Sequence, residues 1–333
     1  MPIKRKASPL TAGVDHLTFD KREFDCSQED IERVCRFFDI GKLRNFKKEK
    51  GISVSHSHFF VYAATSRGEY ALKFYPATAA PAVAAEYSVN RFLRLHHFPT
   101  PVMHAGHNHR PYEKINDRLA ACYSYINGSS AWNNIRRQKT IHQINTAMLS
   151  LKNILSMAKR RISFPKQESF LTTVKVLTQD ARSLPEGDQK KTVKAALISA
   201  FRTYQQHRSL FTRQILHNNI SLTNLLIHQK TVYVLDLSHI REDHAMSDLA
   251  SLVVSCYFFK VPVKTIKNVI EDHFAQHQIN KDRLAVLYSL VKIEMIKEYL
   301  KNARRESSVC TRLYTAHLAE RKRSIMDILK KMP

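Results

Sequence analysis

Hydrophobic and polar positions divide the chain into a first part with strand patterns and a second part with mostly helical ones. Short runs rich in aromatic and β-branched residues at 59–64 and 70–75, separated by the polar turn 66–69, are typical of two paired strands. The next segment, 81–95, begins with Pro and carries apolar residues at helical spacing. Ahead of the strands, Ser27 is followed by acidic residues and then by apolar positions, which indicates a capped helix.

The second part of the chain is helical in pattern, with one exception. Two β-rich segments at 225–228 and 231–235 are joined by the polar pair Gln229 and Lys230, which predicts a hairpin. Pro and Gly at 185–187 interrupt the helical patterns around the hairpin. These patterns fill 130–160, 166–182, 188–209, 245–259, 263–276 and 281–329.

The hairpin and the loop before it carry the most specific chemistry of the chain. Phosphoryl transfer from a nucleoside triphosphate needs two groups that hold Mg²⁺ and one carboxylate that orients the attacking hydroxyl and receives its proton. Kinase-like folds place this carboxylate and one metal ligand five residues apart on a loop, and the second metal ligand after the next hairpin. Here the interval runs from Asn219 to Asn224, and the hairpin ends at Asp236. An acid in the apolar run 232–237 is costly to bury unless it is paired or binds a metal.

At these residues the sequence resembles the aminoglycoside phosphotransferase and choline kinase-like family. The loop of that family reads His-Gly-Asp-x-His-x-x-Asn, and its metal strand reads Ile-Asp-Phe. His217, Asn224 and Asp236 match this pattern. Three loop positions depart from it: Asn218 stands for Gly, Asn219 for the catalytic Asp and Ser221 for the second His.

The resemblance implies an α+β, two-lobed protein kinase-like fold. We expect an N-terminal extension at 1–27, then an N-lobe at 28–127 that contains a small antiparallel sheet and one helix. The larger, mostly helical C-lobe would cover 128–333, with the catalytic-loop hairpin at 215–237.

The resemblance also implies which side chains would bind ATP. Lys73 matches the family's phosphate-contacting lysine, and Glu86 matches the ion-pair partner that holds this lysine in place. The segment 119–128 resembles the strand and hinge where backbone groups, here those of Tyr125 and Ile126, meet the adenine. Taken singly, Lys73 and Glu86 also fit solvated surface positions, so it is their order along the chain that favours the functional interpretation.

The remaining site residues would hold the phosphates, the metal and the loop. The expected phosphate loop, 51–58, has one Gly. The hydroxyls of Ser53 and Ser55 could donate to phosphate oxygens, although this stretch taken alone favours an ordinary polar turn. By the resemblance, Asn224 and Asp236 would bind Mg²⁺. His217 would support the loop, and Asp248 would brace it.

With Asn219 in place of the catalytic Asp, the site could still bind a metal but would lack its proton acceptor. Asn has nearly the shape of Asp but accepts no proton, and general-base assistance is typically worth ~10² to 10⁴-fold. Because the phosphoryl transition state is loose, positioning and metal electrostatics supply most of the rate. We therefore expect an ATP- and Mg²⁺-dependent phosphotransferase of reduced activity that acts on a hydroxyl-bearing small molecule. The alternative is a pseudokinase, a non-catalytic nucleotide-binding or scaffold protein with a basic partner-docking surface.

Charge narrows the choice of acceptor. The chain has 53 Lys and Arg against 29 Asp and Glu, a formal net charge of +24. An enzyme for a polycationic aminoglycoside is expected to present acidic residues around its acceptor, so the composition argues against a drug-resistance role. A small-molecule or anionic acceptor fits better, and charge alone also leaves nucleic acid or an anionic surface open as partners. Nothing in the sequence indicates an oligomeric state.

Cysteine spacing and hydropathy bear on the cellular compartment. The five cysteines are scattered without metal-ligand spacing, which suits reduced thiols. The N-terminus has no apolar signal-peptide core, and no apolar run reaches the ~18 residues of a membrane span. These features predict a cytoplasmic protein.

Overall fold

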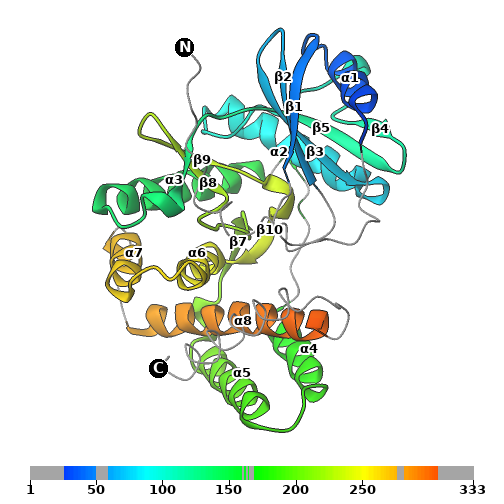
Figure 1. Ribbon diagram of the computed structural model, residues 1–333. Coiled ribbons are helices and arrows are strands. Elements are labelled where there is room, and N and C mark those ends of the chain that lie inside the picture. The colour runs from blue at the N-terminus through cyan, green and yellow to red at the C-terminus, as the bar shows by residue number, and fades with distance from the viewer. Residues whose placement is uncertain are drawn as a thin grey trace.

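The computed structural model describes residues 26–49, 59–159, 161–162, 164, 169–275 and 281–306. An antiparallel sheet flanked by helices forms one lobe, and a mostly helical lobe lies beneath it (Figure 1). The predicted α+β, two-lobed kinase-like fold class is therefore confirmed. The division at residues 127 and 128 and the extension at 1–27 stay predictions, and Ser53 and Ser55 lie outside the described residues.

The N-lobe sheet has the strand order β1-β2-β3-β5-β4, and all neighbouring strands are antiparallel. Its strands are β1 (Leu43–Glu49), β2 (Phe59–Thr65), β3 (Glu69–Pro76), β4 (Glu113–Ile115) and β5 (Arg118–Ser124). Its helices are α1 (Gln28–Phe37) and α2 (Ala80–Leu95). The predicted cap of α1 is confirmed, because Ser27 Oγ accepts the Asp30 N–H and the Asp30 carboxylate accepts the Ser27 N–H.

Side chains that alternate along β3 and β5 give the sheet two apolar faces. Leu72 and Phe74 pack in a core with α1, whereas Tyr75 packs in a separate core with Val83 of α2. Successive side chains of a strand point to opposite faces, so Lys73 shares the face of Tyr75 and is directed toward α2.

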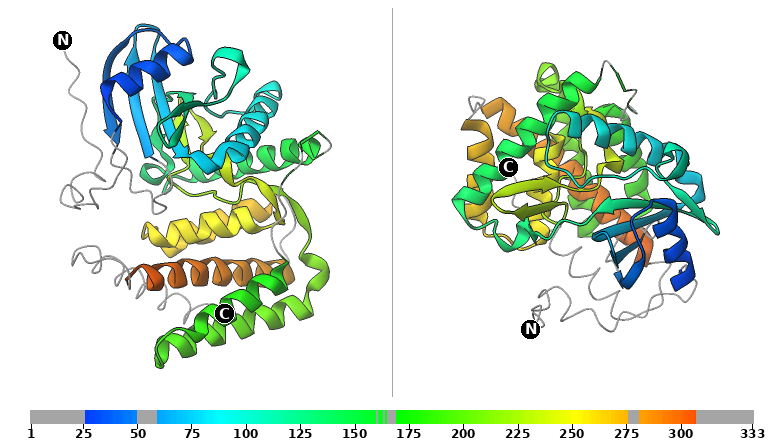
Figure 2. Two further views of the ribbon diagram at one scale, coloured as in Figure 1. Left: turned by 90° about the vertical axis from the view of Figure 1, so that its right-hand side faces the viewer. Right: turned by 90° about the horizontal axis from the view of Figure 1, so that it is seen from above.

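The C-lobe combines short strands with long helices. Strands β6 (Ser129–Ser130), β8 (Leu225–His228) and β9 (Thr231–Val234) form one small sheet, and β7 (Arg213–Leu216) pairs with β10 (Arg241–His244). The helices are α3 (Gln138–Ala158), α4 (Phe170–Arg182), α5 (Asp188–Gln206), α6 (Ser247–Phe258), α7 (Val263–Ala275) and α8 (Lys281–Glu306). Short 3₁₀ turns occur at Ala77–Ala79, His107–His109, Ala131–Asn133, Arg208–Leu210 and Leu237–His239. Figure 2 shows α6, α8 and the α4–α5 pair stacked in successive layers below the hairpin.

The predicted β8–β9 hairpin and most predicted helices are confirmed, and one range is corrected. Residues 130–137 are not α-helical: Ser130 ends β6, its Oγ accepts the Trp132 N–H, and a 3₁₀ turn follows before α3 begins at Gln138. A serine that satisfies a nearby backbone N–H in this way competes with helix formation. The predicted helix 281–329 is described only to Glu306.

Two hydrogen bonds from the segment after α2 set the position of the end of β9. The Val234 N–H donates to the Pro99 carbonyl at 3.1 Å, and the Thr100 hydroxyl donates to the Val234 carbonyl at 2.9 Å. The segment after α2 thereby holds β9 two residues before Asp236. Within the described residues, no helix is long and apolar enough to cross a bilayer.

Candidate active site

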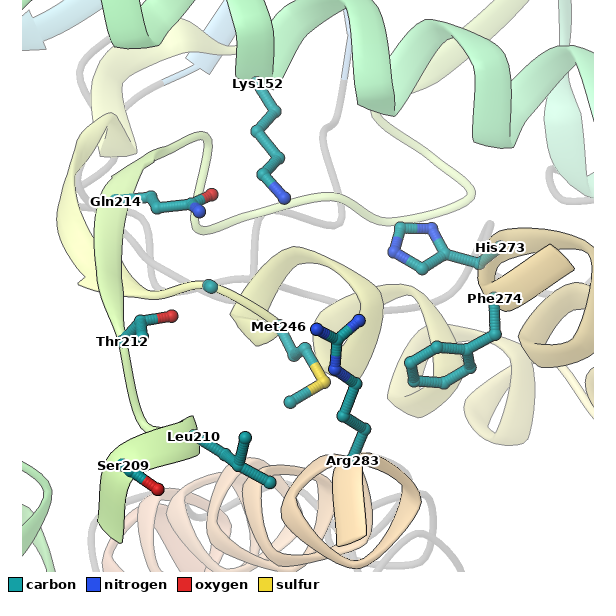
Figure 3. Close-up of a pocket in the computed structure, with 10 residues that line it drawn as sticks. Lys152, Ser209, Leu210, Thr212, Gln214, Met246, His273, Phe274 and Arg283 are labelled. Atoms are coloured by element: carbon teal, nitrogen blue, oxygen red, sulfur yellow. The ribbon is translucent and has the colours of Figure 1, made fainter. Parts of the chain in front are cut away.

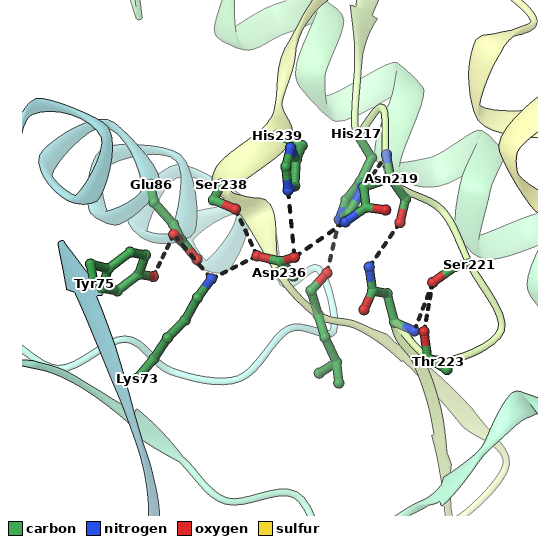
Figure 4. A network of polar contacts seen from close by, with 12 residues as sticks. Lys73, Tyr75, Glu86, His217, Asn219, Ser221, Thr223, Asp236, Ser238 and His239 are labelled. Carbon is green, nitrogen blue, oxygen red and sulfur yellow. Dashed lines mark hydrogen bonds and ion pairs between the residues drawn. The ribbon is translucent and has the colours of Figure 1, made fainter. Parts of the chain in front are cut away.

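The candidate active site lies where β3, α2, the loop after β7 and the end of β9 meet (Figure 4). The Lys73 side chain is 2% exposed, and its Nζ lies 2.7 Å from Asp236 Oδ1 and 3.9 Å from Glu86 Oε2. Burial lowers the pKa of Lys73, but the carboxylates of Glu86 and Asp236 outweigh it and raise the pKa above its ordinary value. Lys73 is therefore charged. The predicted ion pair with Glu86 is present, and Asp236 is a second and nearer partner.

Glu86 is held by two tyrosine hydroxyls. Tyr75 donates to Glu86 Oε2 at 2.8 Å and Tyr123 donates to Oε1 at 2.9 Å. Burial and the charge of Glu86 raise the pKa of both phenols well above their ordinary value, so both remain protonated donors. The Tyr75 ring also lies under Lys73, with Nζ 4.6 Å from the ring centroid. The buried carboxylate thus has donors that do not depend on the lysine.

The Asp236 carboxylate accepts hydrogen bonds from three parts of the chain. Its Oδ1 accepts from Lys73 and from the Ser238 hydroxyl at 2.7 Å each, and its Oδ2 accepts from Asn219 Nδ2 at 3.2 Å. Burial raises the pKa of this carboxyl, but the Lys73 ammonium in particular holds it well below the usual range. Its backbone is left-handed, with φ 59° and ψ 67°, a conformation that Asp tolerates better than most residues. Asp236 is therefore an ionised carboxylate at neutral pH.

The side chains of His217 and Asp248 hold the loop backbone through hydrogen bonds. Burial lowers the pKa of His217 to about 4, so its ring is neutral. Its Nε2 donates to the Leu235 carbonyl at 2.9 Å, which leaves Nδ1 to accept the Asn219 N–H at 3.3 Å. The Asp248 carboxylate accepts the backbone N–H groups of His217 at 3.1 Å and Asn218 at 2.7 Å. Both predicted supporting residues contact the loop.

The asparagines of the loop differ in what they contact. Asn218, which stands for the family's Gly, has φ 61°, a left-handed conformation that Gly and Asn accommodate. Asn219 directs its amide N–H at Asp236, and Asn224 Nδ2 donates to the Asn219 carbonyl at 2.9 Å. Among the described residues, the Asn224 amide oxygen takes no hydrogen bond.

Replacement of Asp248 by Ala tests how the loop is held. The change leaves two buried N–H groups without an acceptor, and we expect a loss of about 2–4 kcal/mol in unfolding free energy at pH 7.5. Burial raises the pKa of Asp248 to about 6, so this group stabilises the wild type more as pH falls through 6, and the deficit should be larger at pH 5. Urea denaturation at pH 7.5 and pH 5 measures the difference in unfolding free energy from the wild type. Asp117→Ala, at an exposed position, is the control. A deficit below 1 kcal/mol at both pH values would contradict this account.

The segment predicted as the hinge, Tyr125 and Ile126, forms hydrogen bonds through its backbone. The Tyr125 N–H is already used, because it donates to the Glu69 carbonyl at 3.1 Å and extends the β3–β5 pairing. The Ile126 carbonyl accepts the Gly128 N–H at 2.8 Å. The Tyr125 carbonyl and the Ile126 N–H have no backbone partner among the described residues. This acceptor and this donor are the backbone groups that the prediction requires for an adenine.

The residues present fit a divalent cation bound together with phosphates. Asp236 and Asn224 supply a carboxylate and an amide oxygen, the hard oxygen donors that Mg²⁺ prefers. Within the described part of the chain, no three His, Cys, Asp or Glu side chains gather into a metal cluster. Mg²⁺ is commonly held by one or two carboxylates plus substrate phosphates, which agrees with so small a donor set.

The sheet over a helical lobe, with a loop and hairpin at their junction, defines a protein kinase-like fold. Residues 50–286 match the model of the phosphotransferase enzyme family, and the chain belongs to that family. No curated protein matches the sequence.

Solved structures with this fold include small-molecule kinases. Amicoumacin kinase, in complex with AMP-PNP, Ca²⁺ and Ami, is 12% identical with a TM-score of 0.69, covering 93% of this chain and 95% of that one. A microcompartment-associated aminopropanol kinase is 12% identical with a TM-score of 0.69, covering 92% and 97%. Spectinomycin phosphotransferase, in complex with ADP and spectinomycin, is 11% identical with a TM-score of 0.66, covering 92% and 98%. At these identities the likeness concerns the fold.

The sequence did not predict the tyrosine pair, nor the Ser238 hydroxyl that donates to Asp236. Tyr75 lies two residues after Lys73, and Tyr123 lies on β5, which pairs with β3. The two-residue period indicates that Tyr75 shares the lysine's face, but tyrosines on strands usually pack in cores. Only the packing of α2 against this face brings Glu86 to both hydroxyls.

Proposed function

We propose that the chain is an ATP- and Mg²⁺-dependent phosphotransferase that acts on a hydroxyl-bearing small molecule, at a rate reduced by Asn219. One observation carries the proposal: Lys73, Asp236 and Asn219, from distant parts of the sequence, form one polar network. Family membership and the kinase-like fold support the same reaction class.

Each residue of the network has a role in this proposal. Lys73 exchanges its contact with Asp236 for phosphate oxygens of ATP, while Glu86 keeps the ammonium near its present place. Asp236 and Asn224 would hold Mg²⁺, which would neutralise charge on the phosphates. Asn219 lies where it can hydrogen-bond an acceptor hydroxyl, but its amide cannot take up the proton. The hydroxyl proton then passes to solvent or to an oxygen of the transferred phosphoryl group, with ADP as the leaving group, and the missing base slows the reaction.

A pseudokinase is the second candidate, and one observation favours it. Lys73 and Asn219 both donate to Asp236, and the Asn219 amide offers no proton acceptor where the family has its catalytic Asp. A scaffold that never binds a nucleotide would keep these contacts permanently, and its basic surface would serve a partner.

Thermal-shift titration with ATP and Mg²⁺ tests the proposal. We expect a saturable rise in Tm for the wild type, since a ligand at ~100 times its Kd stabilises a protein by about 2.7 kcal/mol. Asp236→Ala should abolish the rise, because the carboxylate that holds the metal is gone, whereas the exposed Asp117→Ala should keep it. Absence of any rise in the wild type would exclude nucleotide binding, and a rise without measurable phosphoryl transfer would favour the pseudokinase.

A further inference from the structure

A second hollow lies in the C-lobe, apart from the candidate active site. It has a volume of about 220 Å³ and lies between α3, β7 and the starts of α6 and α8, with the end of α7 at its side (Figure 3). This is the liquid volume of roughly seven water molecules, enough for a small organic ligand. None of the described residues that line it is acidic.

Two cations from different helices face this cavity. Lys152 of α3 and Arg283 of α8 point toward one another across it, and His273 of α7 lies at one side (Figure 3). Lys152 is half-buried and makes no ion pair or hydrogen bond with the described residues. Burial and the charge of Arg283 lower the pKa of Lys152, and the attraction of Asp248 only partly opposes them. Lys152 thus points into the cavity with no ion pair of its own among the described residues and with a second cation opposite, an arrangement that an anion would stabilise.

The rest of the lining suits a small organic anion. Leu210, Met246 and Phe274 give one part of the cavity an apolar wall. Gln214 of β7 lines it too, and within the described chain its buried amide oxygen has no hydrogen-bond partner. Buried polar atoms normally have a protein, water or ligand partner. The amide can turn to present its N–H₂ group to an oxyanion.

We propose that this cavity binds a small organic oxyanion, a phosphate or carboxylate on an apolar body. Lys152 and Arg283 pair with the oxyanion, and Phe274 and Met246 cover the apolar body. The site differs from the ATP site in all its residues. Gln214 lies three positions before His217, so the bound molecule contacts the strand that leads into the catalytic loop.

Isothermal titration calorimetry with phenyl phosphate, benzoate and neutral benzyl alcohol tests the site. We expect saturable binding of phenyl phosphate or benzoate, and the stronger of the two identifies the head group. Benzyl alcohol should bind at least tenfold more weakly. Lys152→Met and Arg283→Met should each weaken anion binding at least tenfold, whereas Lys264→Met, which removes an exposed charge from α7, should not change it. No anion binding, or equal binding by all variants, would overturn the proposal.

Thermal stability gives an independent readout. Lys152→Met keeps the aliphatic stem and removes one of two facing charges, so the unliganded variant should melt at a higher temperature than the wild type. Lys152→Gln, which keeps a polar end, should behave in the same way. A lysine with a purely structural role predicts the opposite, and lower Tm values for both variants would overturn the proposal.

Discussion

Asn219→Asp is expected to raise phosphoryl transfer at least tenfold. The new carboxylate accepts the proton of the acceptor hydroxyl, and general-base assistance is worth ~10² to 10⁴-fold. The backbone needs no adjustment, because the Asn219 N–H donates to His217 and its carbonyl accepts from Asn224 whichever side chain is present. ATP turnover under saturating Mg²⁺ measures the effect, and Asn219→Ala, which removes the amide without adding a base, should show no gain.

The same variant should also change how the protein responds to Mg²⁺. Asn219 Nδ2 donates to Asp236 Oδ2 at 3.2 Å, so an Asp here places two carboxylates against one another. We expect the metal-free variant to be less stable than the wild type and to gain more stability from Mg²⁺. A fall in turnover, in contrast, would assign Asn219 to an altered but working mechanism.

Lys73→Met is expected to cost about 3–5 kcal/mol of unfolding free energy at pH 7, the range for removal of one partner from a buried ion pair. Methionine keeps the apolar stem, but the carboxylates of Glu86 and Asp236 then lie buried without their cation. Urea denaturation measures the loss. The control is Lys114→Met, an exposed lysine of the same sheet, which should change stability by less than about 0.5 kcal/mol.

The effect of Lys73→Met should depend on pH in a defined direction. In the wild type the pKa of Asp236 is lowered, so its contribution is complete at neutral pH and is lost only as pH falls below the ordinary value near 3.8. Without the lysine, burial raises this pKa, and the folded variant takes up a proton before the unfolded chain does. The gap between variant and wild type should therefore narrow from pH 7 to pH 5. A constant gap would show that lost packing, not charge, accounts for the change.

Much of this site could be predicted from the local hydrophobic pattern and from the order of the motifs along the chain. The β2–β3 and β8–β9 hairpins, the helix that carries Glu86 and the loop from His217 to Asn224 all have their signal within short stretches of sequence. Such signals depend on side-chain periodicity and turn residues, which act over a few positions. The predicted start of α3 is wrong because the apolar pattern continues through 130–137. In this stretch the Ser130 side chain accepts a backbone N–H and a 3₁₀ turn forms in place of the α-helix.

The amino-acid sequence, through its resemblance to the family, was sufficient to predict the kinase-like fold and the replacement of the expected Asp by Asn219. It also placed the site residues in order along the chain: Lys73, Glu86, Asn219, Asn224 and Asp236. The tertiary structure decided which of these residues touch. Lys73 pairs first with Asp236, 163 positions away, and Glu86 accepts from Tyr75 and Tyr123. Such contacts depend on how the two lobes and their sheets pack. A buried charge is stabilised by the opposite charge or hydrogen-bond donor that this packing brings nearest. The cavity between Lys152 and Arg283 arises in the same way, from helices whose sequence pattern shows only that they pack.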